Sequence, residues 1–393
     1  MFFLPVMLFL FLAPLGKTLR GSASRSENRA NLAFFVQVSN TSVLNFPRLL
    51  RAIWHERNIY VIHFDMKIGS VQRKQILRLL KEDDASRFAN VIVMDSEAIS
   101  YAGISMLLNT INGLSALLRA STTWDYFINI SGSDYPLVSA NTLRQLLGSA
   151  PVLSSQLNFL QTQAADKNMD WFFNRRMSQV QIDTALWERG EDASATIADA
   201  DSFEQDWALV GVNASHPVSR NRVPFVKTEG WVILHRSFCD FAVNSPAARR
   251  LLLSFATARA ADELFFGTLL MSSGNFRDTV AWDGLRYILW GMDGKRWSRP
   301  AYLDQIGEPE RLRDLITTSG ALFARKFAVP ESKLADYIDA EVSGVGQDHE
   351  VNRTAVHEYA ERARRRLQCV VEKRDNILLR GSADSSSRRF SSK

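Results

Sequence analysis

The stretch Thr123–Leu137 reads TWDYFINISGSDYPL. It begins as an apolar, aromatic run and changes abruptly at Ser131 into Ser-Gly-Ser-Asp, which ends in the carboxylate of Asp134. Short runs rich in aromatic and β-branched residues, bounded by Gly, Ser and Pro, are typical of buried strands. The stretch therefore predicts a buried strand with a carboxylate just beyond its carboxyl end.

Segments on the amino-terminal side repeat this arrangement. LAFFVQVS, IYVIHFD and ANVIVMD each read as a strand, and helical patterns follow them in FPRLLRAIWHERN, VQRKQILRLLKEDD and GISMLLNTINGLSALLRAS. This alternation predicts an α/β fold with a mostly parallel central sheet covered by helices. Ligands bind such sheets beyond the carboxyl ends of the strands. Asp65, Asp95 and Asp134 all follow strands, so we expect a ligand site at that edge.

Composition divides the rest of the chain. The Ala- and Asp-rich region around 188–225 predicts a loop-rich insert. The segment ADELFFGTLLMSS predicts a helix that begins with two acidic residues, which the positive end of the helix dipole stabilises. After Lys333 the sequence is charged and helical, and beyond Arg380 it is Ser- and Arg-rich, which predicts disorder. We therefore expect an apolar segment, a linker, a main domain, a helical extension and a disordered tail, at 1–16, 17–30, 31–330, 331–380 and 381–393.

The amino terminus, MFFLPVMLFLFLAPLG, is apolar over residues 1–16. It is shorter than the roughly 20 residues of a membrane helix and matches the hydrophobic part of a signal peptide. Lys17 and Arg20 follow the run instead of preceding it, and no A-x-A cleavage site is present. A cleaved signal peptide and a short uncleaved membrane anchor therefore both stay open, and either takes the chain into the secretory pathway.

Four sequons fit that compartment. Those at Asn40, Asn213 and Asn352 could accept glycans on surface loops, whereas Asn129 lies inside the predicted buried strand.

Charge and cysteine content exclude several classes of function. Lys+Arg 47 against Asp+Glu 42 gives a net charge of +5, and this small excess does not favour a nucleic-acid partner. Cys239 and Cys369 indicate neither a zinc cluster nor a disulfide scaffold, although a single bridge stays open. Gly-rich phosphate loops, GxSxG and HExxH are absent, which disfavours P-loop enzymes, serine hydrolases and metalloproteases.

Metal binding is not expected. The Asp-x-Asp pair Asp199-Ala-Asp201 stands in an Ala-rich polar stretch with no strand before it, and His63 is interpreted as a core residue. Without a metal, the negative charge of a leaving diphosphate must be stabilised by cationic side chains and helix N-termini. The candidate cations are Lys295, Arg296, Arg299, Arg325 and Lys326.

Six sequence blocks carry a resemblance to a known family. In chain order they are IYVIHFDMK, WDYFINISGSDYPL, EGWVILHRSF, ADELFFGTLL, LRYILW and SGALFARKF, within about Asn31 to Phe327. They resemble the core-2/I-branching enzyme family of glycosyltransferases, which also contains peptide O-xylosyltransferases and plant glucuronosyltransferases. The resemblance implies a GT-A-like nucleotide-sugar transferase fold. It also implies a single-pass Golgi enzyme with a lumenal catalytic domain, inverting and independent of metal; secretion after signal cleavage is the alternative.

By this resemblance Glu263, in the ADELFF block, is the general base. The chemistry makes the same demand, because an inverting transfer needs a carboxylate that takes the proton of the attacking acceptor hydroxyl. The alternative is that Glu263 only stabilises the N-terminus of a helix, where the helix dipole favours a negative charge. Glu229 is a possible acceptor contact.

The resemblance also implies a set of donor contacts. The nucleoside would lie near Asp65 and Lys67, and Arg325 and Lys326 would hold the diphosphate. Trp231 would lie beside the sugar; the alternative is that it only packs in the hydrophobic core. Asp134 would lie near the donor sugar or stabilise the loop around it; an Asp that only caps a tight turn before Pro136 is the alternative. The predicted donor-binding set is Asp65, Lys67, Asp134, Trp231, Arg325 and Lys326.

Some positions depart from the family pattern. The block before the predicted active-site strand reads Glu229-Gly230-Trp231, SYAGIS places Tyr101 where relatives have a Trp-Gly pair, and Ser298-Arg299-Pro300 replaces a His-Pro pair. We predict sugar transfer from a UDP donor, UDP-xylose ahead of UDP-N-acetylglucosamine, to a hydroxyl of a protein or glycan acceptor, with a possible acceptor-facing role for the insert. A catalytically silent binding relative is the main alternative. An acid–base glycosidase is a weaker one and needs a second carboxylate about 5 to 9.5 Å away.

Overall fold

The computed structural model describes residues 29–82, 89–162, 179–186, 209–212, 225–292, 295–296, 299–345 and 350–390. Its centre is a seven-stranded sheet with the order β10-β6-β9-β4-β1-β2-β3. Neighbours among β1, β2, β3 and β4 run parallel, whereas β9 is antiparallel to both β4 and β6. The strands are β1 (Leu32–Val38), β2 (Ile59–Phe64), β3 (Val91–Val93), β4 (Tyr126–Ser131), β6 (Asn158–Phe159), β9 (Ile233–His235) and β10 (Val280–Ala281).

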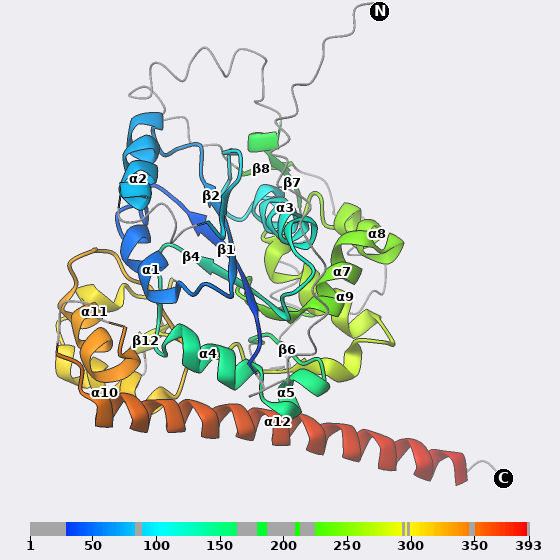
Figure 1. Ribbon diagram of the computed structural model, residues 1–393. Coiled ribbons are helices and arrows are strands. Elements are labelled where there is room, and N and C mark those ends of the chain that lie inside the picture. Colours follow the sequence, from blue (N-terminus) through cyan, green and yellow to red (C-terminus); the bar gives the residue numbers. More distant parts are fainter. Residues whose placement is uncertain are drawn as a thin grey trace, which may run out of the picture.

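Helices cover both faces of this sheet (Figure 1). Because side chains alternate along a strand, β1 sends Leu32 and Phe34 into one hydrophobic core and Ala33 and Phe35 into the other. The first core packs on α1 (Phe46–Ile53), α4 (Ala140–Leu147), α5 (Ala150–Ser154), α10 (Pro309–Ser319), α11 (Lys333–Ile338) and α12 (Arg353–Phe390). The second packs on α3 (Ile104–Ala120), α7 (Arg236–Asn244), α8 (Pro246–Ser254) and α9 (Phe265–Ser272). The predicted α/β fold is confirmed.

The edge of the sheet beyond β3 is less buried than the centre. Ile92 and Val93 are partly exposed there, and α2 (Ser70–Glu82) connects β2 to this edge.

A second, three-stranded sheet has the order β11-β14-β5. It consists of β11 (Arg286–Ile288), β14 (Phe323–Arg325) and β5 (Asp134–Pro136). β5 follows β4 directly in the chain, so the stretch Thr123–Leu137 joins the two sheets. The carboxyl end of β4 is therefore the place where late segments of the chain meet the central sheet.

The predicted helical extension is one long helix, α12, which lies along the lower side of the molecule (Figure 1). Tyr359, Ala363, Leu367 and Val370 bury one side of it in the first core. The helix continues to Phe390, past the point at which the composition predicted disorder. Once a helix is nucleated by packing, each further residue adds a hydrogen bond for only its own ordering.

Other sequence predictions have mixed outcomes. Cys239 is buried, Cys369 is exposed on α12, and both are free thiols, so the single bridge left open does not form. Asn129 is buried as predicted, and Asn40 and Asn352 are exposed. Within the described part of the chain, no helix combines the length and apolar character needed to span a membrane. The apolar segment 1–16 and the sequon at Asn213 lie outside the described residues.

The contact of α3 with β1 requires a glycine. A Cβ on Gly113 would lie 2.3 Å from Cδ2 of Phe35, whereas a Cβ on Gly274 would meet nothing within 4 Å. For Gly113→Ala we expect a lower free energy of unfolding, because overpacking costs roughly 1–3 kcal/mol and outweighs the gain in helix propensity of about 0.5–1 kcal/mol. Urea unfolding measures the change, with Gly274→Ala as the control. Equal stability of the two variants would contradict the close packing.

Candidate functional site

The turn after β4 is built around Asp134. The Gly132 N–H donates to the Gln37 carbonyl, and a Cβ at Gly132 would lie 2.7 Å from Ser42 Oγ, so only glycine fits without displacing a neighbour. One carboxylate oxygen of Asp134 accepts hydrogen bonds from the Ser131 N–H at 2.6 Å and the Ser131 hydroxyl at 3.0 Å. Asp134 therefore fixes the turn in which it stands, as one of the sequence interpretations held.

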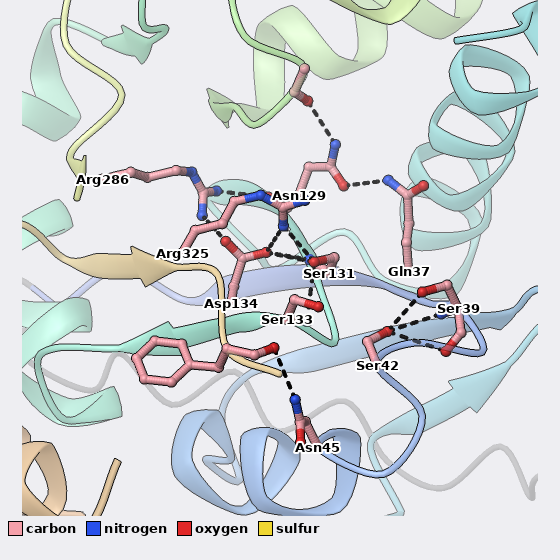
Figure 2. Close-up of polar contacts among 12 residues, drawn as sticks. Gln37, Ser39, Ser42, Asn45, Asn129, Ser131, Ser133, Asp134, Arg286 and Arg325 are labelled. Carbon is pink, nitrogen blue, oxygen red and sulfur yellow. Dashed lines mark hydrogen bonds and ion pairs between the residues drawn. The ribbon is translucent and has the colours of Figure 1, made fainter. Parts of the chain in front are cut away.

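Two arginines from the second sheet meet the same carboxylate (Figure 2). Arg325 donates to Oδ2 of Asp134 at 2.9 Å, and a guanidinium nitrogen of Arg286 lies 3.5 Å from Oδ1. The Asp134 side chain is 0% exposed and the Arg286 side chain 2%. Arg286 also donates to the Asn129 carbonyl at 2.7 Å. One buried carboxylate thus joins β4, β11 and β14.

The arginine nearer the surface lies against Trp231. The Arg325 guanidinium carbon is 4.0 Å from the centre of the indole ring, within the range of a cation–π contact. Asp134 therefore positions Arg325, and Arg325 in turn contacts the residue that the sequence predicts beside the donor sugar.

Lys326 is held by its backbone while its side chain stays available. The Leu303 N–H donates to the Lys326 carbonyl at 2.7 Å, and the next residue, Phe327, donates to the Ser133 carbonyl at 2.9 Å. The ammonium lies 5.6 Å from the Tyr302 ring centre. Burial lowers the pKa of Lys326 to about 8, and the nearby cations Arg325 and Arg299 add to this effect. These cations repel one another, so an anion among them would be stabilised.

The predicted base stands at the start of α9. Glu263 ends a short 3₁₀ helix, η5 (Ala261–Glu263), and its side chain is 28% exposed. One oxygen, Oε2, lies 3.7 Å from the Lys227 ammonium. The Lys227 cation therefore pairs with the predicted base.

A second carboxylate, Glu229, is buried close to the first. Burial raises its pKa, the Glu263 charge raises it further, and Lys227 and Arg286 oppose the shift. Gly230 follows it in a tight space, because a Cβ there would lie 2.6 Å from an Asp262 oxygen. The Asn129 side chain donates to the Gly230 carbonyl at 2.9 Å, which ties this segment to β4.

These groups line one cavity of about 120 Å³. It brings together carboxylates and cations that the sequence predicts to act in the same site. The charged lining residues are Glu229, Asp262, Glu263, Arg325 and Lys326. Asp134 does not line the cavity; it lies beneath Arg325.

Polar and aromatic side chains complete the lining. Trp231 and Trp290 contribute aromatic surface, and Tyr101 contributes an exposed ring. Gln37 donates to the Asn129 amide oxygen at 2.8 Å, so both of these lining residues belong to the network of Figure 2. Of the residues predicted from sequence, Trp231, Glu229, Glu263, Arg325 and Lys326 are brought together here.

Asp65 and Lys67 lie elsewhere, in the loop after β2. The Lys67 N–H donates to Asp65 Oδ1 at 3.0 Å, and its ammonium is 3.7 Å from Oδ2. Burial raises the pKa of Asp65, and the contacts with Lys67 oppose the shift. Neither residue lines the cavity, and their nucleoside role stays a prediction. Asp95 is exposed after β3.

Sequence reasoning missed three residues of the network. Arg286 stands in the quoted block LRYILW, where an arginine within a short apolar strand was the available signal. Gln37 and Asn129 are likewise polar residues within otherwise apolar strands, so the same kind of signal was available for them.

His63 is a core residue, as interpreted from the sequence. Its ring nitrogens lie 3.0 Å from the Glu97 N–H nitrogen and 3.1 Å from the Asn109 amide nitrogen, and burial lowers its pKa to about 4. Among the described residues no group of three His, Cys, Asp or Glu side chains could hold a metal ion, and Asp199 and Asp201 lie outside them.

Comparison with known proteins identifies the family of this chain. The family model described as Core-2/I-Branching enzyme matches residues 32–313. The chain belongs to the core-2/I-branching enzyme family. The match contains β1 and every charged residue of the cavity except Arg325 and Lys326, which follow it.

Relatives of this chain are named as glycosyltransferases that transfer different sugars. Beta-glucuronosyltransferase GlcAT14A of Arabidopsis thaliana is 27% identical over 320 residues, 80% of this chain and 64% of the relative. A xylosyltransferase of Ciona intestinalis is 25% identical, over 85% of this chain and 36% of its own. The mouse beta-1,3-galactosyl-O-glycosyl-glycoprotein beta-1,6-N-acetylglucosaminyltransferase 4 is 25% identical, over 64% and 49%. The chain therefore spans less than two thirds of each of these relatives.

Removal of the Asp134 charge tests the buried network. In Asp134→Asn the two arginines lose their counter-charge, and breaking a buried pair in this way costs about 3–5 kcal/mol of unfolding free energy. Urea unfolding measures it. The control is Glu308→Gln, which removes an exposed pair with Arg311 and is expected to cost less than about 1 kcal/mol. A loss in Asp134→Asn no larger than in the control would show that the carboxylate does not hold the two sheets together.

Proposed function

We propose that this chain is an inverting glycosyltransferase that moves a sugar from a UDP donor to an acceptor hydroxyl. The observation that carries the proposal is the cavity in which the Glu263 carboxylate and the Arg325 and Lys326 cations line one space. Direct displacement at an anomeric carbon needs these two kinds of group, one for the proton of the nucleophile and one for the charge of the leaving group.

Glu263 is proposed as the general base. The acceptor oxygen attacks the anomeric carbon, its proton passes to the Glu263 carboxylate, and the bond from the sugar to UDP breaks. Lys227, 3.7 Å from Glu263, pairs with this carboxylate and helps to hold its side chain in the cavity. Glu229 lines the same cavity beside Trp231, and we propose it as an acceptor contact, with Trp231 beside the donor sugar.

Lys326 and Arg325 are proposed to hold the diphosphate. Asp134 keeps Arg325 in place from below, and the backbone bonds of Lys326 and Phe327 fix the segment. With two cations at this position, we propose that the leaving charge is neutralised by side chains and that no metal ion is required. We also propose Asp65 and Lys67 as contacts of the nucleoside.

The donor sugar is the finer part of the proposal. The sequence blocks favour UDP-xylose and then UDP-N-acetylglucosamine. The similarity to Arabidopsis GlcAT14A, named a beta-glucuronosyltransferase, supports UDP-glucuronate as a further candidate. The acceptor is a protein or glycan hydroxyl in the secretory pathway, and a Golgi membrane location through residues 1–16 is part of the same proposal.

A second candidate is a catalytically silent relative that binds glycans or partners in the same cavity. The presence of Glu263 and of both cations in the cavity argues against it, because a binding protein has no use for a base beside an anion site. Nucleotide binding and turnover separate the two candidates.

Substitution of Glu263 tests the mechanism. We expect Glu263→Gln to lower kcat by roughly 10²–10⁴-fold while UDP affinity is retained, because an amide cannot take the acceptor proton. UDP release is measured from UDP-xylose, UDP-N-acetylglucosamine and UDP-glucuronate in EDTA, with methyl β-galactoside or a serine peptide as acceptor.

Glu308→Gln, an exposed Glu far along the chain, is the matched control. Full activity of Glu263→Gln would exclude Glu263 as the base. Absence of UDP binding in the unmodified chain would favour the silent relative.

The Lys326 pKa gives the cation site a pH dependence. Lys326 is charged below its pKa of about 8 and loses its charge above it. We therefore expect the Kd for UDP to rise above about pH 8, by at most about tenfold per pH unit. Calorimetric titration with UDP in EDTA measures this. Lys326→Arg keeps its charge and should give a flat profile, whereas Lys326→Met should bind weakly at every pH. An unchanged rise in Lys326→Arg would assign the pH dependence to another group.

A further inference from the structure

Tyr101 stands at the rim of the cavity with most of its ring in solvent. It lies in the loop between β3 and α3, its exposed fraction is 73%, and it lines the same cavity as Glu263. An aromatic ring of this size normally buries its apolar faces. A ring left open beside a catalytic carboxylate is therefore available to a ligand.

The loop of Tyr101 is joined directly to the turn that carries Glu263. The Ala260 N–H donates to the Ala102 carbonyl at 2.7 Å, and the Glu263 N–H donates to the Ala260 carbonyl at 3.1 Å. Ala102 and Ala260 both have positive φ, 63° and 51°, in the left-handed region that alanine rarely adopts. Strained backbone persists where the surrounding structure imposes it, and such positions cluster at functional sites.

An antiparallel pair of strands holds both loops. It consists of β7 (Val180–Asp183) and β8 (Leu209–Val212). The buried Asp183 carboxylate accepts from the Ser105 N–H at 2.8 Å, at the first turn of α3. A Cβ on Gly103 would collide with that carboxylate. In the same strand, β7, the Gln181 N–H donates to the Thr257 carbonyl at 2.9 Å, shortly before Ala260.

We propose that Tyr101 is an acceptor-binding residue and that the acceptor it receives is a glycan. The ring supports the apolar C–H face of an acceptor pyranose, whose hydroxyl then faces the Glu263 carboxylate. Asp183 is the positioning residue that holds the Tyr101 loop. This inference rests on the proposed function and names the acceptor class for the same site.

The chemistry of the rim fits a pyranose better than a peptide or a nucleobase. A pyranose has an apolar face and an edge of hydroxyls, which match an aromatic ring and the carboxylates Glu229 and Glu263 in one cavity. A small serine side chain has no face that needs such a platform. The link through Ala102 and Ala260 couples the ring to the base, whereas the cations proposed for the diphosphate come from β14 and the residue after it.

The experiment compares Tyr101→Ala and Tyr101→Phe in the full-length chain. With methyl β-galactoside as acceptor, we expect Tyr101→Ala to raise the acceptor KM by about tenfold or more, because the variant loses one stacked ring. The donor KM and the UDP Kd should stay unchanged. Tyr101→Phe keeps the ring and should therefore recover most of the acceptor affinity that Tyr101→Ala loses. Asp183→Ala should also raise the acceptor KM and spare the donor KM, a split that general destabilisation would not give.

Several outcomes would overturn the inference. A rise in the donor KM instead of the acceptor KM would show that Tyr101 contacts the donor nucleotide. Turnover only with the serine peptide would show that the acceptor is a protein. Equal acceptor KM values for Tyr101→Ala and the unmodified chain would remove Tyr101 from the site. Glu263→Gln separates the two proposals: if it abolishes transfer, the proposed function stands whichever way the Tyr101 variants behave.

Discussion

The buried carboxylate of Asp134 is the interaction on which this structure depends. It accepts hydrogen bonds within the turn after β4 and forms ion pairs with Arg286 and Arg325, which come from the second sheet. A buried charge is tolerated only when it is paired and hydrogen-bonded, so each of the three partners requires the others. Because β5 is continuous with β4, this cluster fixes how the small sheet meets the large one.

That constraint places the chemistry of the cavity. Arg325 is drawn toward Asp134 on one side and lies against Trp231 on the other, so the cation, the indole and the segment of Glu229 are fixed as one unit. The Glu263 turn approaches from a different part of the chain and is tied to the Tyr101 loop. The Thr228 N–H, next to Glu229, donates to the Glu263 carbonyl at 2.8 Å, so the Glu263 turn and the Arg325 cation line one small cavity although they come from distant parts of the chain.

The fold could be predicted in large part from the sequence, because apolar runs and helical patterns report burial locally. The runs at β1, β2 and β4 and the helical pattern of α3 gave the parallel core. The antiparallel direction of β9 and the three-stranded sheet could not be predicted, since pairing partners lie far apart in the chain. The helical continuation of α12 past Arg380 also departs from composition, which carries no information on propagation from a packed helix.

The sequence by itself determined which residue types the site contains. Five of the predicted residues, Glu229, Trp231, Glu263, Arg325 and Lys326, line one cavity. Tertiary structure decided their geometry: Asp134 lies beneath the cavity as a support, Asp65 and Lys67 stand apart from it, and Arg286 joins the network from β11. Local patterns report whether a residue is buried, but the partner of a buried charge is set only when distant strands pack, and that packing alone makes a carboxylate a support or a reactive group.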